Sequence, residues 1–388
     1  MLGIDYIKIA IANAYGLDHT TWEERMLWVD SERNAWGTLH ERVHDAKEPY
    51  QFIAGIKALE DAEEGIPTGY IMGLDACSSG IQLMSLLSGD VSGAELSGLI
   101  HTGIRRDVHR TIQADVNKVV PNNFTRSEFK QAGMTVMYGS LAAPSNIFGD
   151  QDIIDAFYES LENRLPECIK LLNAMIAAHK KDATEYKWTL PDGHVALVKV
   201  MDSQEYTIVL DRLENIPFTH RTKENVPKEK DVSLAANIIQ SIDAYVVREL
   251  GLRCNYDTKA LMRTYELLES LHIPRCIPIE PISIVHAYEL SASNLLNYTP
   301  SELYWLKQLV HKVLLKEPFE QISVHDKFFC SPNNMNVLRD HIKDIYSELA
   351  RMDLMENILT EIKGSPSGYV KKPSNIAEEI LKSEYIIS

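Results

Sequence analysis

Apolar and polar residues follow one another with a helical period over long stretches of this chain, and with a shorter, strand-like pattern in a few places. Apolar positions recur three and four residues apart between residues 6 and 15 and between residues 49 and 56, which predicts two amphipathic helices. The segment from Asp18 to Thr21 has the composition of a helix cap and predicts another helix from Trp22. The first 69 residues are therefore expected to be helical.

A short apolar run from Tyr70 to Met72 ends at Gly73-Leu74-Asp75, and a small-residue segment then leads into a helical pattern from Ile81. This order predicts a buried strand with Asp75 at its end, where the strand meets a helix. A carboxylate in such a place is costly to desolvate unless a partner such as a divalent cation compensates for the loss of water. An aspartate that caps a turn or helix is the alternative that this segment leaves open.

Sequence patterns typical of β-strands occur again in the middle of the chain. Lys187 to Gly193 predicts a strand and a hairpin turn, and the stretches 195–200 and 206–210 predict further strands. The polar, proline-containing stretch from Asn215 to Asp231 predicts a loop. Closer to the C-terminus, Phe319 to Phe329 contains two apolar stretches on either side of a His-Asp pair, which predicts a hairpin with Asp326 at its tip.

The segment from residue 126 to 140 predicts a helix with an unusual face. Residues about four apart lie one turn above each other, so Arg126, Lys130, Met134 and Tyr138 form one stripe. Two cations below an aromatic hydroxyl suit a nucleoside triphosphate, because the cations can bind phosphate oxygens. An amphipathic helix with solvated basic residues and a core tyrosine is the alternative.

Composition and charge narrow the class of protein. The 388 residues carry a formal net charge of −16 and are 45% hydrophobic, which favours a globular protein and argues against one that coats nucleic acid. Any contact with nucleic acid is expected to be local. The segment 105–130 concentrates positive charge in Arg105, Arg106, Arg110, Lys118, Arg126 and Lys130.

The five cysteines are scattered, with no pair at zinc-ligand spacing, and are expected to be reduced and mostly in the core. No apolar run of membrane-spanning length and no signal peptide is present, so we expect a cytoplasmic protein without membrane contact.

Three of these segments, in this order, resemble the motifs of one family. Asp75-Ala76-Cys77-Ser78-Ser79-Gly80-Ile81-Gln82 is similar to motif A of the single-subunit RNA polymerases of bacteriophages and mitochondria. The spacing Arg126-x3-Lys130-x7-Tyr138-Gly139 is similar to their motif B. His325-Asp326 resembles motif C, in which Lys327 stands where the family usually has serine.

The resemblance also includes weaker matches outside these three motifs. The segment from Ala236 to Asp243 resembles a family helix beside the primer terminus, where Gln240 would contact the primer or template. His286 is a weaker rival for that position. Residues 252–303 exceed the family's usual length and are interpreted as an insertion. The region 187–231 resembles a family hairpin followed by a loop that reaches DNA, and residues 376–388 resemble a short helix and a tail that folds back towards the active site.

The resemblance implies an α+β, mostly helical fold: a right-hand polymerase palm and fingers around a small antiparallel sheet, lacking the family's N-terminal domain. Residues 1–69 would be a helical segment that docks a partner. Residues 70–104 would form palm with motif A, residues 105–235 fingers with motif B and the hairpin region, and residues 236–388 palm with motif C, the insertion and the tail.

The implied chemistry is nucleotidyl transfer with two Mg²⁺ ions. Asp75 and Asp326 would be the catalytic metal ligands, and Arg126, Lys130 and Tyr138 would bind the nucleoside triphosphate. Related DNA polymerases carry a glutamate that crowds the sugar 2′ position where this chain has Gly80. Since glycine has no side chain to clash, ribonucleotides are expected to fit.

Partners follow from the same resemblance: a DNA template, an RNA product, ribonucleoside triphosphates, and a second polymerase subunit. The chain begins in the middle of the family's pattern and looks like the catalytic polypeptide of a split phage RNA polymerase, acting in the cytoplasm of an infected bacterial cell. The family's phosphate-contacting lysine is replaced here by Asp18-His19. A family A-like DNA polymerase fragment and a non-catalytic, palm-containing scaffold subunit are the alternatives.

Overall fold

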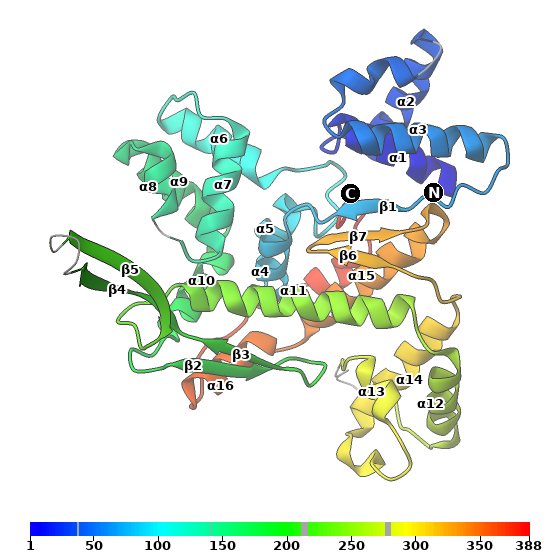
Figure 1. The fold of residues 1–388 in the computed structure, drawn as a ribbon. Coiled ribbons are helices and arrows are strands. Elements are labelled where there is room, and N and C mark those ends of the chain that lie inside the picture. The colour runs from blue at the N-terminus through cyan, green and yellow to red at the C-terminus, as the bar shows by residue number, and fades with distance from the viewer. Residues whose placement is uncertain (37–38, 141, 211–215, 276–280) are drawn as a thin grey trace.

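A small antiparallel sheet lies at the centre of the molecule, with helices grouped around it (Figure 1). The computed structural model describes residues 1–36, 39–140, 142–210, 216–275 and 281–388. The strand order is β1-β7-β6, formed by β1 (Met72–Asp75), β7 (Lys327–Cys330) and β6 (Ile322–Val324). The predicted strand at Asp75 and the predicted hairpin around Asp326 are both confirmed, and they pair with each other.

One face of this sheet is apolar and buried. Met72 and Leu74 of β1 lie opposite Cys330 and Phe328 of β7, and all four are at most 2% exposed. Because side chains alternate along a strand, the other face carries Asp75 and its cross-strand partner Lys327. The sheet thus buries hydrocarbon on one side and presents charge on the other.

Helices from several parts of the chain surround the main core. They are α4 (Ser79–Ser88), α5 (Val91–Leu96), α10 (Pro166–Ala177), α11 (Ser233–Cys254), α15 (Met335–Arg351), α16 (Leu354–Lys363) and α17 (Ile376–Ile380), with the short 3₁₀ turn η4 (Pro332–Asn334). Every residue of α4 is buried, which explains its nearly uncharged sequence.

The N-terminal helices form a separate group with its own apolar cluster, as the helical periodicity of the first 69 residues predicts. They are α1 (Gly3–Tyr15), α2 (Trp22–Trp36) and α3 (Pro49–Glu63), with the 3₁₀ helix η1 (Leu39–Asp45). Across the sheet from them lies a second group (Figure 1), made of α6 (Val108–Val119), α7 (Arg126–Met137), α8 (Ala143–Phe148) and α9 (Gln151–Arg164).

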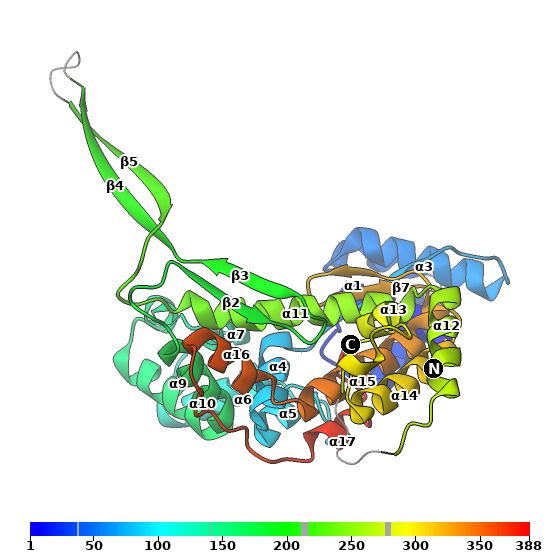
Figure 2. The ribbon, with the colours of Figure 1, turned by 90° about the horizontal axis from the view of Figure 1, so that it is seen from below.

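Two hairpins follow in the chain. β2 (Glu185–Thr189) pairs with β3 (Val195–Lys199), as predicted. β4 (Met201–Leu210) pairs with β5 (Ile216–Asn225) in a long ribbon that projects from the body of the molecule (Figure 2). The predicted loop from Asn215 to Asp231 is therefore wrong over β5, while Asn215 itself lies outside the described residues. Almost every residue of β5 is exposed, so it lacks the apolar alternation that identifies a half-buried strand.

Residues 255–318 form an excursion with a small apolar cluster of its own. It contains α12 (Thr258–Ser270), α13 (Val285–Glu289), η3 (Leu295–Asn297) and α14 (Pro300–Leu314). The amide of Phe319 donates a 2.7 Å hydrogen bond to the carbonyl of Cys254, so the chain leaves and returns at one place. The segment 252–303, interpreted from the sequence as an insertion, overlaps this excursion, and its being an insertion stays a prediction.

The cysteines that the structure describes are free: Cys77, Cys168, Cys254 and Cys330. Cys276 lies outside the described residues. Among the described helices, none combines the length and the apolar character needed to cross a membrane.

Candidate active site

The pairing of β1 with β7 brings Asp75 and Asp326 together. Asp75 is the last residue of β1, and its register partner is Lys327, the residue directly after Asp326. The amide of Ala76 donates a 3.0 Å hydrogen bond to the carbonyl of Asp326. Two carboxylates that are distant in the sequence therefore lie at the same end of the central sheet.

The turn that carries Asp326 is tight. Val324 pairs directly with Lys327, so His325 and Asp326 form a two-residue connection between β6 and β7. His325 has φ of 56°, in the left-handed region where histidine is tolerated better than most side chains. Backbone strain of this kind is frequent at functional sites, because the surrounding structure must hold it in place.

The electrostatic environment of Asp75 reflects this proximity. Burial raises the pKa of Asp75 above its ordinary value, and the neighbouring carboxylate of Asp326 raises it further. Lys327 and Lys130 act on the same pKa in the opposite direction. Two like charges held this close favour a cation between them.

A third carboxylate, that of Asp243, interacts electrostatically with Asp326. Burial, reinforced by the charge of Asp326, raises the pKa of Asp243 on α11 to about 7. The sequence resemblance includes the segment from Ala236 to Asp243 but predicts no role for Asp243 itself. The available signal was a carboxylate three residues after Gln240, on a helix whose neighbouring positions Ile239 and Ile242 are apolar and buried.

The predicted cationic stripe lies on α7. Thr125 and Glu128 form a reciprocal capping box, which fixes the start of the helix at Arg126. Phe129 packs into the core, whereas Lys130 and Met134 face outwards. The periodicity of the sequence therefore predicted the face of this helix correctly.

The end of α7 is fixed by a glycine. Gly139 has φ of 93°, and a β-carbon there would lie 2.6 Å from the carbonyl oxygen of Val232. Only glycine combines that backbone conformation with so close an approach. Tyr138, the residue before it, is thereby held at the C-terminal end of the helix.

Arg126 is held by an acidic partner. Its Nε donates a 2.6 Å hydrogen bond to Asp107, whose carboxylate also caps α6 by accepting from the amides of His109 and Arg110. The hydrogen bond from Arg126 and that from the Arg110 amide outweigh burial and lower the pKa of Asp107. The terminal nitrogens of Arg126 have no partner among the described residues other than Asp107 and remain available to a ligand.

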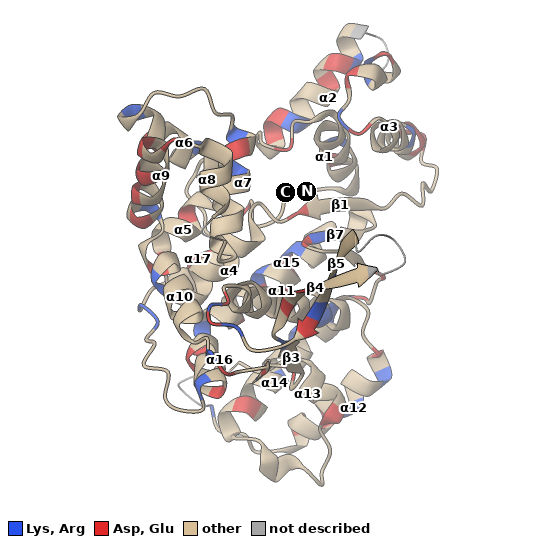
Figure 3. Ribbon diagram, turned by 60° about the vertical axis from the view of Figure 1, so that its left-hand side comes forward, with Lys and Arg blue, Asp and Glu red and all other residues tan. Residues whose placement is uncertain are grey.

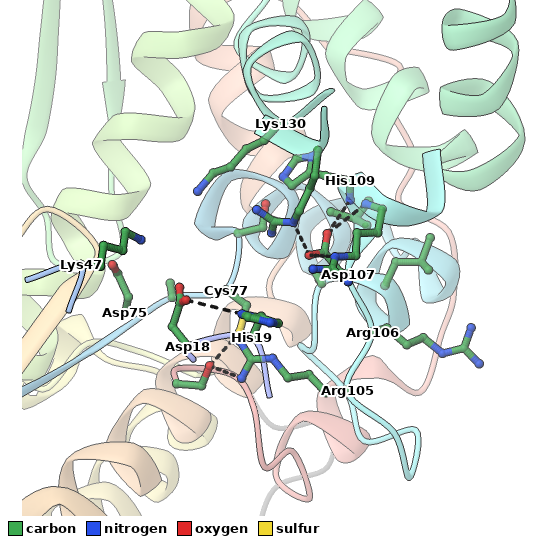
Figure 4. A pocket seen from close by; sticks show the side chains of 18 residues that line it. Asp18, His19, Lys47, Asp75, Cys77, Arg105, Arg106, Asp107, His109 and Lys130 are labelled. Carbon is green, nitrogen blue, oxygen red and sulfur yellow. Dashed lines mark hydrogen bonds and ion pairs between the residues drawn. The ribbon is translucent and has the colours of Figure 1, made fainter. Parts of the chain in front are cut away.

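A cavity of about 340 Å³ connects these groups. Figure 4 shows Lys47, Asp75 and Asp18 towards one end of it and Asp107 and His109 towards the other. Its charged lining is mainly basic and consists of Lys47, Arg105, Arg106, Arg110, Arg126 and Lys130 against Asp18, Asp75 and Asp107. In Figure 3 the basic start of α7 lies on the side of its helical group towards the N-terminal helices, and acidic residues mark both α2 and α9.

His109 lines this cavity and is buried. It is 2% exposed, and burial lowers the pKa of His109 to about 4 against the opposing charge of Asp107. Among the described residues, neither ring nitrogen has a hydrogen-bond partner. The imidazole is therefore neutral near pH 7 and adds no charge to the cavity.

Gly80 and Tyr138 meet in a second cavity, of about 170 Å³, which also contains Asp75, Lys130 and Asp326. Burial and the charge of Asp243 raise the pKa of Tyr138, while a hydrogen bond with the Ser79 side chain acts in the opposite direction. The phenol is thus protonated and can donate a hydrogen bond at neutral pH.

The C-terminal tail borders the same site. The amide of Ser388 donates a 2.8 Å hydrogen bond to the carbonyl of Asp75, and Ile387 bridges Ala76. Arg105 donates a 2.6 Å hydrogen bond to the Ser388 hydroxyl. The expected return of the tail towards Asp75 is therefore observed.

The other candidate residues from the sequence lie in several different parts of the structure. Gln240 is exposed on α11 and is therefore not a core residue. Lys327 lies beside Asp75, with its ammonium 5.6 Å from the centre of the Phe329 ring. His286 belongs to α13 and lines a different cavity, together with residues of α16 such as Glu361. Lys118 pairs with Asp115 and does not line the basic cavity.

The residues at the sheet end fit a magnesium site. Within the described part of the chain, no group of three or more His, Cys, Asp or Glu side chains is arranged to hold a metal ion by itself. Mg²⁺, however, is usually bound through one or two carboxylates and completes its shell with phosphate and water oxygens. Asp75 and Asp326 supply that donor set beside a cavity large enough for phosphates.

The sequence of this chain is also similar to the sequences of known RNA polymerases. The sequence model of the DNA-dependent RNA polymerase family matches residues 1–143, the part that contains both Asp75 and α7. The DNA-directed RNA polymerase of Pseudomonas phage phiKMV is 24% identical over 315 residues, which cover 65% of this chain and 38% of that enzyme. The mitochondrial DNA-directed RNA polymerase of Neurospora crassa is 26% identical over 163 residues, or 35% of this chain and 12% of the relative. The chain thus spans less than half the length of these two relatives, and over the matched parts it is similar in sequence to DNA-directed RNA polymerases of a phage and of a mitochondrion.

Proposed function

We propose that this chain is the catalytic part of a DNA-directed RNA polymerase, which extends the 3′ end of an RNA by ribonucleotides on a DNA template. The observation that carries the proposal is the meeting of Asp75 and Asp326 at one end of the sheet, across a basic cavity from α7. The homology to phage and mitochondrial polymerases supports the same activity.

Each group has a role in phosphoryl transfer, which depends mainly on positioning and charge neutralisation. Asp75 and Asp326 would hold two Mg²⁺ ions. When bound, these ions lower the pKa of the RNA 3′-hydroxyl and neutralise charge on the departing pyrophosphate. Arg126 and Lys130 would bind the triphosphate, with the guanidinium of Arg126 oriented by Asp107.

The choice of sugar would be made where Gly80 faces Tyr138. The absence of a side chain at Gly80 leaves the adjoining cavity open, and the protonated Tyr138 hydroxyl can bond a ribose hydroxyl. Gln240 is exposed on α11, the helix that also carries Asp243, and would contact the primer or template. The site would therefore take ribonucleoside triphosphates.

Primer extension tests this proposal. The chain, purified with the co-expressed neighbouring gene product because activity is expected to require a partner subunit, is incubated with a primed DNA template, Mg²⁺ and either ribo- or deoxyribonucleotides. Wild-type protein should extend with ribonucleotides, Asp75→Asn and Asp326→Asn should each lose more than about 100-fold in rate, and the exposed Asp155→Asn should not change it. Preferred use of deoxyribonucleotides would favour a DNA polymerase fragment, and equal inactivity of all the proteins with or without partner would favour a scaffold.

The second subunit stays a prediction of the sequence, as does action in the cytoplasm of an infected bacterial cell. Co-expression with the neighbouring gene product, followed by purification through a tag on this chain, would test the partner. A stoichiometric complex with higher extension activity than the chain alone is expected. Full-rate elongation by the chain alone would contradict the prediction.

A further inference from the structure

Lys47 occupies a fixed position on the N-terminal side of the basic cavity. It lies between η1 and α3, where its amide donates a 3.3 Å hydrogen bond to the carbonyl of Tyr15. The amide of the next residue, Glu48, donates a 2.9 Å bond to the carbonyl of Ala14. These two bonds attach the backbone at Lys47 to the C-terminal end of α1, so its side chain starts from a defined point.

The side chain of Lys47 faces the acidic centre of the site. It lines the cavity of about 340 Å³ and an adjoining one of about 150 Å³, and Asp75 lines both. Figure 4 shows Lys47 at the same end of the larger cavity as Asp75 and Asp18. Lys47 is thus on the opposite side of the cavity from α6 and its cap Asp107.

The ammonium group of Lys47 is available for a ligand. No ion pair or side-chain hydrogen bond engages it among the residues that the structure describes. Other lysines of the same helical group are paired, as Lys8 is with Asp30 at 2.7 Å and Lys57 with Asp61 at 3.7 Å. An unpaired ammonium beside a cavity whose charged lining is mainly basic is suited to a bound polyanion, which it can contact as a point charge.

We infer that Lys47 contacts the phosphates of the incoming nucleotide from the N-terminal side, so that the triphosphate is held between the N-terminal helices and α7. This inference rests on the proposed function and adds a residue to it. On the α7 side of the cavity lie Arg126 and Lys130, and Arg126 already shares its charge with Asp107. The other cations that line it, Arg105, Arg106 and Arg110, come from the segment 105–110. Asp18 and His19 line the same side of the cavity as Lys47. Asp18 cannot neutralise phosphate, and His19 lies 3.8 Å from Asp18, so Lys47 is the residue among these three that can supply a positive charge to a phosphate.

Equilibrium binding of nucleotides tests the inference without requiring turnover. Binding of Mg-ATP and of AMP to the full chain is measured for wild type, Lys47→Met, Lys47→Arg and the matched control Lys57→Met. Lys47→Met should weaken Mg-ATP binding about 10-fold and leave AMP binding within about twofold, because the lost contact is to the outer phosphates. Lys47→Arg should retain most of the affinity, and Lys57→Met should bind as wild type does.

A charge placed elsewhere in the same cavity provides a second test. His19→Lys in the Lys47→Met background should restore Mg-ATP affinity, since His19 lines the same cavity. Unchanged ATP affinity in Lys47→Met, or an equal loss of ATP and AMP binding, would overturn the inference. Failure of the proposed function appears differently, as wild-type protein that binds Mg-ATP but extends no primer under any condition.

Discussion

The contact between Gly80 and Tyr138 leaves no room for a side chain at position 80. A β-carbon at Gly80 would lie 2.9 Å from Tyr138 Oη and 3.1 Å from Cζ, closer than side-chain atoms normally approach. Any larger residue must therefore displace the tyrosine ring or the helix that carries position 80. The glycine and the phenol act as one unit at the place where a nucleotide sugar would lie.

A change of sugar preference follows from this contact. Tyr138→Phe removes the hydroxyl that would bond the ribose, and Gly80→Glu fills the space beside it. Each should lower the ratio of kcat/KM for ribo- over deoxyribonucleotides, by about 2- to 10-fold for Tyr138→Phe, the effect of one neutral hydrogen bond. Single-nucleotide incorporation measures the ratio, with Tyr158→Phe as control. If both substrates lose activity equally, the residues have no part in sugar selection.

Asp243 predicts a pH dependence of stability in the absence of divalent metal. Its folded pKa of about 7 lies above the value near 4 of an unfolded aspartate, so between pH 4 and 7 the unfolded chain binds fewer protons. The free energy of unfolding should therefore fall as pH rises through this window, by roughly 4 kcal/mol at most. In Asp243→Asn this contribution should be absent, as urea unfolding with EDTA from pH 4 to 8 would show. Parallel curves for the two proteins would contradict this account.

At the scale of elements, α11 depends on a buried ion-pair network. Arg253 is fully buried and pairs with Glu249 at 2.6 Å and with Glu348 of α15 at 2.5 Å. Glu249 also accepts hydrogen bonds from the Ser283 hydroxyl and from the amide of Ile284. The network joins α11 to α15 and to the excursion, and it satisfies charges that would otherwise be costly to bury.

Removing the cation should be strongly destabilising. Arg253→Met leaves two buried carboxylates without their partner, and the expected cost is about 3–5 kcal/mol in the free energy of unfolding. The exposed pair of Arg221 with Glu205 gives the matched control, because Arg221→Met should cost less than about 1 kcal/mol. Urea denaturation of both variants at neutral pH measures the difference. Similar small losses in the two would mean that water reaches the Arg253 network.

At the scale of the whole molecule, the apolar residues divide into a main core and two smaller clusters, one in the N-terminal helices and one in the excursion. The N-terminal helical group supplies residues to the wall of the basic cavity, whereas none of the excursion's described residues lines it. The two peripheral clusters therefore differ in their relation to the site.

The excursion should be removable without loss of nucleotide binding. Residues 256–317 can be replaced by a short Gly-Ser linker, because the hydrogen bond between Phe319 and Cys254 keeps the two ends together. The shortened protein should bind Mg-ATP within about twofold of wild type, with some loss of stability because Glu249 loses two partners. Circular dichroism and nucleotide binding check this. A folded variant that binds no ATP would give the excursion a role in the site.

The sequence predicted local structure well where the signal is local. The capping box at Thr125 and Glu128 and the helical spacing of Phe129 fix both the start and the face of α7. It failed for β5, whose exposed residues pair only with another exposed strand and so follow no apolar period. It also missed Asp243 and Lys47, because neither belongs to a pattern that local spacing makes visible.

The sequence by itself determined the first three helices and α7, the strand that ends at Asp75, the His-Asp turn and the order of the three motifs, since each depends on neighbouring residues. Only the tertiary structure decided that β1 pairs with β7, that Asp243 approaches Asp326, and that Lys47 lines the same end of the cavity as Asp75. Such contacts join distant segments, and their geometry follows from burying the apolar face of the sheet, which local periodicity does not encode.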